Sequence, residues 1–187
     1  SEKTVLPPFD RTAVQIRREI ARSEPDMARI ERLIAGDAGL TSQLLRMANS
    51  AFYRGLKKVS TVRSAMVRLG TGEIANIVLL AAHRKHYVSG NRYYRSILVR
   101  LWRHSVGCAI GAHWLAKKCG LTKAAGEAFT AGLLHDAGKL FLIAVIESLQ
   151  QGDAPGISPS RKLLGEVLES LHTRYGHCLL QRWNLPE

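Results

Sequence analysis

Apolar residues recur every three or four positions along almost the whole chain, and this spacing constrains its fold most strongly. Such a period places apolar side chains on one stripe of an α-helix, whereas a half-buried strand needs strict alternation. No Asn-Gly or Asp-Gly turn flanked by alternating apolar residues occurs, so hairpins are not indicated. The sequence therefore predicts an all-α fold.

Capping residues locate the expected helices. Asp10 precedes the first periodic stretch, and Gly36 follows the second, over 27–34. We expect the other helices over 40–48, over 61–69 closed by Gly70, over 73–82, over 93–118 ended by Gly120, over 123–135 capped by Thr122, over 140–149, from Ser158-Pro159 onward, and over 171–183 before Pro186.

The helices are expected to form two lobes, divided near residues 85–95. We place the domain at 6–187, with an N-terminal helical lobe over 6–88 and a second helical lobe over 89–187. The clearest loop is 152–159, which holds two glycines and two prolines. The chain begins with Ser1 and not with Met, so we expect a fragment of a longer protein.

Positive charge is concentrated in the middle of the chain. The net charge is +12, and residues 38–126 hold fifteen Lys and Arg against one acid, Glu73. A positive field attracts nucleic acids, nucleotides or acidic proteins, although a solvated basic surface is the more common explanation. The segment Tyr87–Arg95 interleaves aromatic residues with Arg92 and Arg95, which suits either a phosphate-binding surface or a loop between lobes.

Cysteine usage and hydropathy indicate a cytoplasmic protein. The three cysteines, Cys108, Cys119 and Cys178, are odd in number and form no C-x-x-C pair, so we expect reduced thiols that pack as small apolar groups. The apolar runs are far shorter than the roughly 20 residues of a membrane span. No signal peptide is recognisable. We therefore expect no association with a membrane.

One set of residues could bind a metal ion. Imidazole nitrogens and carboxylate oxygens converging on one point suit a divalent metal, and His104, the doublet His135-Asp136 and His172 lie on successive expected helices. Lys139 follows one turn after His135 and could face a phosphate. The alternative is structural: a buried Asp136 could pair with a protonated histidine without any metal. On spacing alone that alternative is favoured.

Other catalytic signatures are missing from the sequence. It contains no G-x-x-x-x-G-K-[ST], no G-x-G-x-x-G, no H-E-x-x-H and no G-x-S-x-G. Paired carboxylates for acid–base chemistry are not evident either, because the second half holds few acids.

Several motifs resemble, in the same order, those of the HDOD domain, the HD-related output domain of bacterial signalling proteins. Residues 133–140, LLHDAGKL, resemble the central motif of HD-superfamily metal phosphohydrolases, and 44–53, LLRMANSAFY, is the most distinctive stretch. The resemblance covers 6–187, and its other segments are Leu6–Pro8, Ile34–Thr41 with Ala38 where proline is usual, Val59–Gly70, Leu101–Ser105, Ala128–Asp136, His172–Gly176 and Leu180–Pro186.

The resemblance implies an all-α signalling domain with an incomplete metal site. His104, His135 and Asp136 match the first three ligands of an HD site, and His172 matches a histidine that supports a second metal in HD-GYP phosphodiesterases. The aspartate that completes an HD site has no match, and the G-Y-P motif is missing after the doublet. The family usually continues beyond Glu187, so we expect the second lobe to be truncated and leave open a final ligand there.

Two functions follow as hypotheses. The first is a non-catalytic bacterial signal-transduction module, the output of a response regulator, which binds a protein partner or a nucleotide and needs no cofactor. Its partner would be a fused or separate receiver or sensor module. The alternative is a metal-dependent phosphohydrolase that cleaves a nucleotide or cyclic nucleotide with Fe, Mn, Zn or Mg held by the HD-type residues. Lys139, Arg92 and Arg95 are candidate phosphate contacts in either case, and direct nucleic-acid binding ranks last.

Overall fold

A computed structural model describes residues 9–51, 53, 57–151 and 159–183, and these residues form helices and connecting segments without a strand. The prediction of an all-α fold is confirmed. The chain separates into two compact units, one of which is Phe9–Arg84, while the other begins at Lys85. The division lies four residues before the expected boundary between 88 and 89.

The first unit consists of α1 (Arg11–Ile20), α2 (Met27–Ala35), α3 (Ala38–Ala48) and α4 (Val62–Arg84). An aspartate caps each of the first three helices. The side chain of Asp10 accepts a hydrogen bond from the backbone N of Ala13 (3.1 Å), and Asp26 and Asp37 repeat this arrangement at α2 and α3. The expected cap at Asp10 and the end of α2 at Gly36 are therefore correct.

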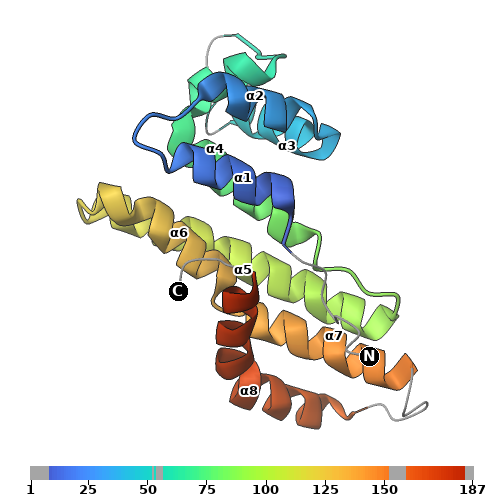
Figure 1. Ribbon diagram of the computed structural model, residues 1–187. Helices are drawn as coiled ribbons and strands as arrows, with labels where there is room; N and C mark the ends of the chain where they lie inside the picture. The colour runs from blue at the N-terminus through green and yellow to red at the C-terminus, as the bar shows by residue number, and fades with distance from the viewer. Residues whose placement is uncertain (1–8, 52, 54–56, 152–158, 184–187) are drawn as a thin grey trace. The chain divides into compact units, whose positions relative to one another are not determined.

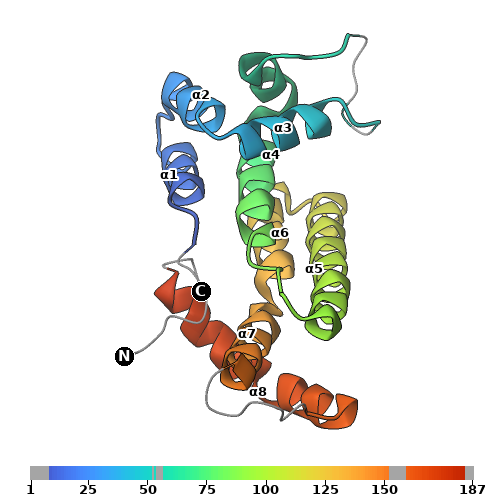
Figure 2. The same cartoon turned by 90° about the vertical axis from the view of Figure 1, so that its right-hand side faces the viewer.

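The helix α4 is the packing partner of α1, α2 and α3 (Figure 2). Gly70 interrupts it with φ 78° and ψ 165°, a conformation that side-chain-bearing residues rarely adopt. The predicted break at Gly70 is thus correct, and α4 is two helices in succession. The fully buried side chains of this unit include Ile16, Ile30, Ile34, Leu44, Ile74 and Leu79.

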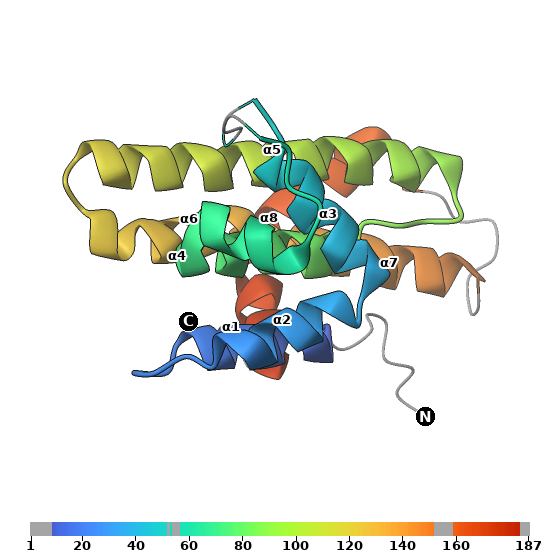
Figure 3. The ribbon, with the colours of Figure 1, turned by 90° about the horizontal axis from the view of Figure 1, so that it is seen from above.

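The second unit contains α5 (Arg92–Lys118), the 3₁₀ turn η1 (Thr122–Ala124), α6 (Ala125–Leu134), α7 (Ala137–Gln151) and α8 (Arg161–Arg182) (Figure 1). Figure 3 shows α5 running beside α6 and α7, which follow one another along it. α8 packs on α7. The fully buried side chains here include Tyr94, Leu98, Leu133, Leu140 and Ile143.

Two expected helix boundaries around the His-Asp doublet are wrong, and one is correct. Thr122 does not cap a helix over 123–135, because residues 122–124 form a 3₁₀ turn and no side chain caps α6. α7 starts at Ala137, immediately after the His-Asp doublet, and not at Leu140. The expected helix end at His135 is correct within a residue, since α6 ends at Leu134.

The last two expected helices are a single helix, α8. Its cap is Ser160, whose hydroxyl accepts from the backbone N of Leu163 (3.1 Å), so the helix does not begin at Pro159. It continues past Leu171 because Leu164, Leu168 and Leu179 keep one buried stripe throughout. The motif at Leu6–Pro8, the loop over 152–158 and the helix end at Pro186 lie outside the described residues.

Two described segments are long and apolar enough to cross a membrane by length and composition alone, 62–84 and 122–151. About half of each candidate window is buried inside the protein, 56% and 50% respectively. Gly70 breaks the first segment, and the His135-Asp136 doublet interrupts the second. Both features are typical of core helices, and the expectation of no membrane association stays a prediction.

Candidate functional site

The His135-Asp136 doublet lies between the end of α6 at Leu134 and the start of α7 at Ala137. Neighbouring helices bring further side chains to it: α5 contributes His104 and Cys108, and α8 contributes His172. All of these residues belong to the second unit. The sequence-predicted residues His104, His135, Asp136 and His172 thus come together in the folded protein.

Two glycines allow the helices to approach the doublet this closely. A Cβ atom on Gly132 of α6 would lie 2.8 Å from the backbone C and O of Cys108 on α5. A Cβ on Gly138 of α7 would overlap the carbonyl oxygen of His172 and lie 2.7 Å from the backbone N of Gly176 on α8. Backbone therefore meets backbone on both sides of the doublet.

Asp136 is the centre of the cluster. Its side chain is only 5% exposed, whereas the His104 and His135 side chains are 56% and 39% exposed. The Oδ2 atom lies 3.4 Å from His135 Nε2 and 3.8 Å from His104 Nε2. Its other oxygen, Oδ1, lies 3.8 Å from His172 Nε2. A buried carboxylate is thus surrounded by three imidazoles, which can balance its charge.

Backbone carbonyls orient two of these imidazoles. His135 Nδ1 lies 2.9 Å from the carbonyl oxygen of Gly132, and His172 Nδ1 lies 3.0 Å and 2.9 Å from those of Leu168 and Glu169. A carbonyl oxygen only accepts hydrogen bonds, so Nδ1 is the donor in both rings. The neutral form of each ring then presents the lone pair of Nε2 to the cluster, as metal-binding histidines do.

The two exposed histidines face each other. The Nε2 atoms of His104 and His135 are 3.2 Å apart. If both rings were neutral with their lone pairs on Nε2, the lone pairs would repel, so a proton or a cation must lie between the two nitrogens. This contact fits a metal ion shared by the two rings, and it fits equally a hydrogen bond that the Nε2–H of His104 donates to Nε2 of His135.

Lys139 occupies the other side of Asp136. Its Nζ lies 3.3 Å from Asp136 Oδ2 and 2.7 Å from Glu169 Oε1. Burial lowers the pKa of Lys139, but the hydrogen bonds and the charges of Glu169 and Asp136 outweigh it, so the pKa is raised. The hydrogen bond and charge of Lys139 lower the pKa of Glu169. The lysine is therefore a charged link between α7 and α8.

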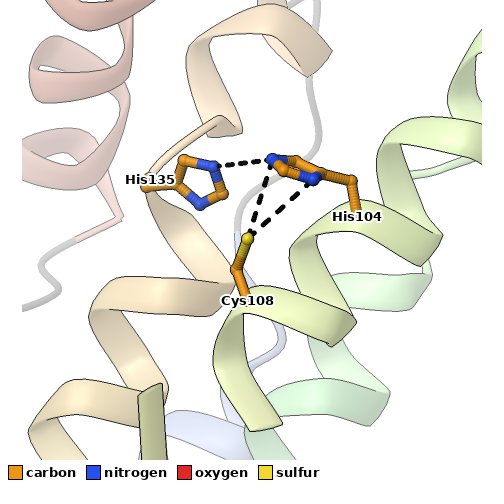
Figure 4. A group of neighbouring side chains, drawn as sticks. All are labelled: His104, Cys108 and His135. Atoms are coloured by element: carbon orange, nitrogen blue, oxygen red, sulfur yellow. Dashed lines mark hydrogen bonds between the residues drawn. The ribbon is translucent and has the colours of Figure 1, made fainter. Parts of the chain in front are cut away.

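Cys108 is a member of the cluster that the sequence analysis did not assign to the site. Figure 4 shows its thiol beside His104, with Sγ 3.9 Å and 3.7 Å from Nδ1 and Nε2 of that ring. The ligand atoms of His104, Cys108 and His135 all lie within 4.8 Å of one another. The signal was present in the sequence, because Cys108 follows His104 by four residues and one helical turn.

The residues fit a divalent metal in part. Two histidine Nε2 atoms, the carboxylate of Asp136 and the thiol of Cys108 surround one region, which is the donor chemistry of a transition-metal site. The carboxylate is the less suitable ligand, because its oxygen Oδ2 already contacts the ammonium group of Lys139. Metal binding by His104, His135, Asp136 and His172 stays a prediction.

The predicted phosphate contacts Arg92 and Arg95 lie elsewhere, at the start of α5 and about three turns before His104. Arg95 donates from Nε to the carbonyl of Ser89 (3.1 Å) and from Nη2 to that of Gly90 (3.4 Å). Tyr87 and Tyr94 are buried, so they offer no stacking surface. The geometry of this segment is that of a structured connection before α5.

The motifs and the helical fold agree with comparison to known proteins. The HDOD domain family matches residues 6–187, so the chain belongs to the HDOD domain family. HDOD domains occur in signalling proteins. The family resemblance and its residue range are therefore correct.

Two relatives match the sequence. A protein of Treponema pallidum without an assigned function is 27% identical over 191 residues, which cover 97% of this chain and 36% of that protein. The cyclic di-GMP phosphodiesterase CdgJ of Vibrio cholerae is 36% identical over 80 residues, which cover 43% of this chain and 18% of CdgJ. The chain thus matches about a third or less of the length of these relatives.

A solved structure has a similar fold. It belongs to a Shewanella amazonensis protein provisionally named a metal-dependent phosphohydrolase, with a TM-score of 0.77 and 20% sequence identity. The match covers 97% of this chain and 65% of that one. At this identity the similarity establishes the fold alone.

Proposed function

We propose that the domain is a non-catalytic output module of a bacterial signalling protein, which binds a protein partner or a nucleotide. The observation that carries this proposal is the position of Lys139, whose ammonium group lies against Asp136 Oδ2 and is itself held by Glu169 at 2.7 Å. A hydrolytic metal would need that oxygen as a ligand, and the lysine competes for it directly.

The remaining donors support the same proposal. An Mg²⁺ site usually has one or two carboxylates together with water ligands. Among the described residues, the basic groups within 4 Å of the Asp136 carboxylate are three histidines and Lys139. Glu169 is engaged by Lys139 and is 71% exposed. A second carboxylate ligand is therefore not supplied by this part of the chain.

The partner would be a receiver or sensor module, fused to the domain or separate, in the bacterial cytoplasm. The family membership supports a signalling role, and both relatives are much longer than the matched region. Cyclic di-GMP is the nucleotide to test first, because it is the substrate that the name of CdgJ states.

The test is a hydrolysis assay with bis(p-nitrophenyl) phosphate and cyclic di-GMP, in the presence of Mn, Fe or Mg. We expect the native chain, Asp136→Asn and His135→Ala to be indistinguishable from buffer. The proposal has two versions, in which the domain binds either a nucleotide or a protein partner. Calorimetric titration with cyclic di-GMP separates them. Binding without turnover would support the nucleotide as the signal, and no binding would support a protein partner. Metal-dependent turnover that Asp136→Asn abolishes would contradict both versions.

One observation favours a second function, a metal-dependent phosphohydrolase. The contact of 3.2 Å between His104 Nε2 and His135 Nε2 matches the separation of two nitrogens bound to one metal ion, and a metal would lower the pKa of a bound water to about 7. In that function His104, His135 and Asp136 would hold the metal, His172 would orient the carboxylate, and Lys139 would turn toward a substrate phosphate. The same assay decides, because this function requires turnover.

A further inference from the structure

We propose that His104, Cys108 and His135 form a zinc site in which Cys108 supplies a thiolate ligand. The site lies on the solvent side of the doublet and uses neither carboxylate oxygen of Asp136 as an essential ligand. It is independent of the proposed function, because a zinc ion held in this way would fasten α5 to the junction of α6 and α7 whether or not the domain binds a partner.

Two of the three separations between the ligand atoms agree with tetrahedral zinc. Zn–N bonds of about 2.0–2.1 Å and Zn–S bonds of about 2.3 Å, at tetrahedral angles, place two nitrogens about 3.3 Å apart and a nitrogen and a sulfur about 3.6 Å apart. The nitrogens of His104 and His135 are 3.2 Å apart, and Cys108 Sγ lies 3.7 Å from His104 Nε2. All three ligand atoms lie within 4.8 Å of one another.

The helix positions these ligands in advance. His104 and Cys108 are four residues apart on α5, so their side chains share one face of the helix. The close contact of Gly132 with the backbone of Cys108 brings the end of α6 to the same place. Gly132 also fixes the ring of His135, since its carbonyl oxygen accepts from Nδ1 and leaves Nε2 free for a metal.

The donor set selects the metal. One thiolate and two imidazoles suit Zn²⁺ and its spectroscopic substitute Co²⁺, whereas Mg²⁺ and Mn²⁺ prefer oxygen ligands. The ammonium of Lys139 stands on the carboxylate side of the cluster, 3.3 Å from Asp136 Oδ2, and disfavours a cation there. His104 and His135 are partly exposed, so an ion can enter from solvent and keep a water as its fourth ligand.

Cobalt titration tests the site without any assay of activity. Cobalt bound through a thiolate gives an intense sulfur-to-metal charge-transfer band in the near ultraviolet, which a site of nitrogen and oxygen ligands lacks. We expect one cobalt per chain, with this band, and its displacement by one equivalent of zinc. Binding without the band, or no binding, would overturn the proposal.

The other two cysteines provide matched controls. Cys119 and Cys178 are both exposed and lie at the end of α5 and on α8. The double variant Cys119→Ser/Cys178→Ser leaves Cys108 as the single thiol, and we expect it to keep the band. Cys108→Ser should lose the band and weaken zinc binding more than about 100-fold, since even outer-shell changes cost 10- to 100-fold. Loss of the band in the double variant would refute the assignment to Cys108.

Asp136→Asn distinguishes this site from the HD-type arrangement. If the thiolate site is correct, this variant weakens zinc binding by about 10- to 100-fold, less than Cys108→Ser does, because Asp136 is then an outer-shell group. If the HD-type set holds the metal, the order reverses: Asp136→Asn loses the metal and Cys108→Ser keeps it. Circular dichroism of each variant confirms that its helices are intact before its affinity is compared.

Discussion

Gly132 and Gly138 lie on either side of the His135-Asp136 doublet, at the two points where helix backbones touch. The side chain that each lacks is what permits the contact, because a Cβ at either position would meet backbone atoms that cannot rotate away. The helix positions around the cluster are therefore set by Gly132 and Gly138, which are not themselves members of the cluster.

The glycine contact can be tested by a pair of alanine substitutions. We expect Gly138→Ala to destabilise the domain by at least about 2 kcal/mol, because the new methyl group must push α8 off α7. Gly165→Ala is the control: a Cβ there meets nothing within 4 Å, and alanine in a helix stabilises by about 0.5–1 kcal/mol. Urea denaturation measures both, and equal effects would refute the packing argument.

At the residue scale, the sequence analysis named the doublet, His104, His172 and Lys139 as candidate site residues, but not Cys108 or Glu169. The doublet was recognisable because its motif is specific. The role of Glu169 as the partner of Lys139 could not be predicted, because it depends on how α8 crosses α7. Cys108 was discounted as an ordinary apolar thiol, although its spacing from His104 placed both side chains on one helical face.

At the scale of elements, the link between α7 and α8 combines backbone contact with an ion pair. Lys139 lies on α7 and Glu169 on α8, and each alters the pKa of the other. The pKa of Glu169 is lowered from 4.5, so its contribution to stability is present above pH 4.5 and is lost as the pH falls through the lowered value. The pKa of Lys139 is raised from 10.5, so its contribution is present below pH 10.5 and is lost as the pH rises further.

A pH series of thermal denaturation checks this linkage. Between pH 4.5 and pH 10.5 we expect the native chain to have a higher melting temperature than Glu169→Gln. The gap between the two melting temperatures should close at more acidic and more alkaline pH. Glu166→Gln, one turn earlier on α8, is the matched control, because Glu166 makes no ion pair with the described residues. A gap of constant size at all pH values would show that the ion pair is not its cause.

The predicted helix boundaries were most accurate where a capping residue or a helix-breaking glycine occurs in the sequence. Asp10, Gly70 and Gly120 mark real helix boundaries, and Gly70 and Gly120 both have positive φ. The errors arose where local signals were ambiguous. Thr122 looked like a cap but begins a 3₁₀ turn, and the serine that caps α8 is Ser160 and not Ser158.

At the scale of the whole molecule, the positive charge is divided evenly. Residues 9–84 and residues 85–187 each hold thirteen Lys and Arg against seven Asp and Glu, so each part has a formal charge of +6. The excess seen over 38–126 therefore spans the division between the units and does not mark one of them as an anion-binding domain. This even division agrees with the low rank given above to nucleic-acid binding as a function.

We expect the chain not to bind duplex or single-stranded DNA at about 150 mM salt. Contact with phosphates alone weakens steeply with salt, so any binding at 50 mM should disappear by 200 mM. Fluorescence anisotropy with unrelated sequences measures both the affinity and its salt dependence. Binding that persists at 200 mM and depends on sequence would contradict the expectation.

Family membership and the all-α fold could be predicted from the sequence because several specific motifs occur in a fixed order over 6–187. The chemistry of the cluster could not, because it depends on whether a proton or a metal ion lies between His104 and His135. The motif predicts which side chains meet. It does not predict that Glu169 holds Lys139 beside Asp136, since this contact requires the positions of α7 and α8 in space.

The backbone contacts at Gly132 and Gly138 also have an evolutionary consequence. Because two glycines, and not the ligands, hold the helices in register around the doublet, a mutation that removes a ligand leaves the scaffold standing. Ligands can then be lost or exchanged one at a time under weak selection, while the glycines stay under strong selection for folding. In a domain built in this way, the side chains of the cluster can change while the architecture is kept.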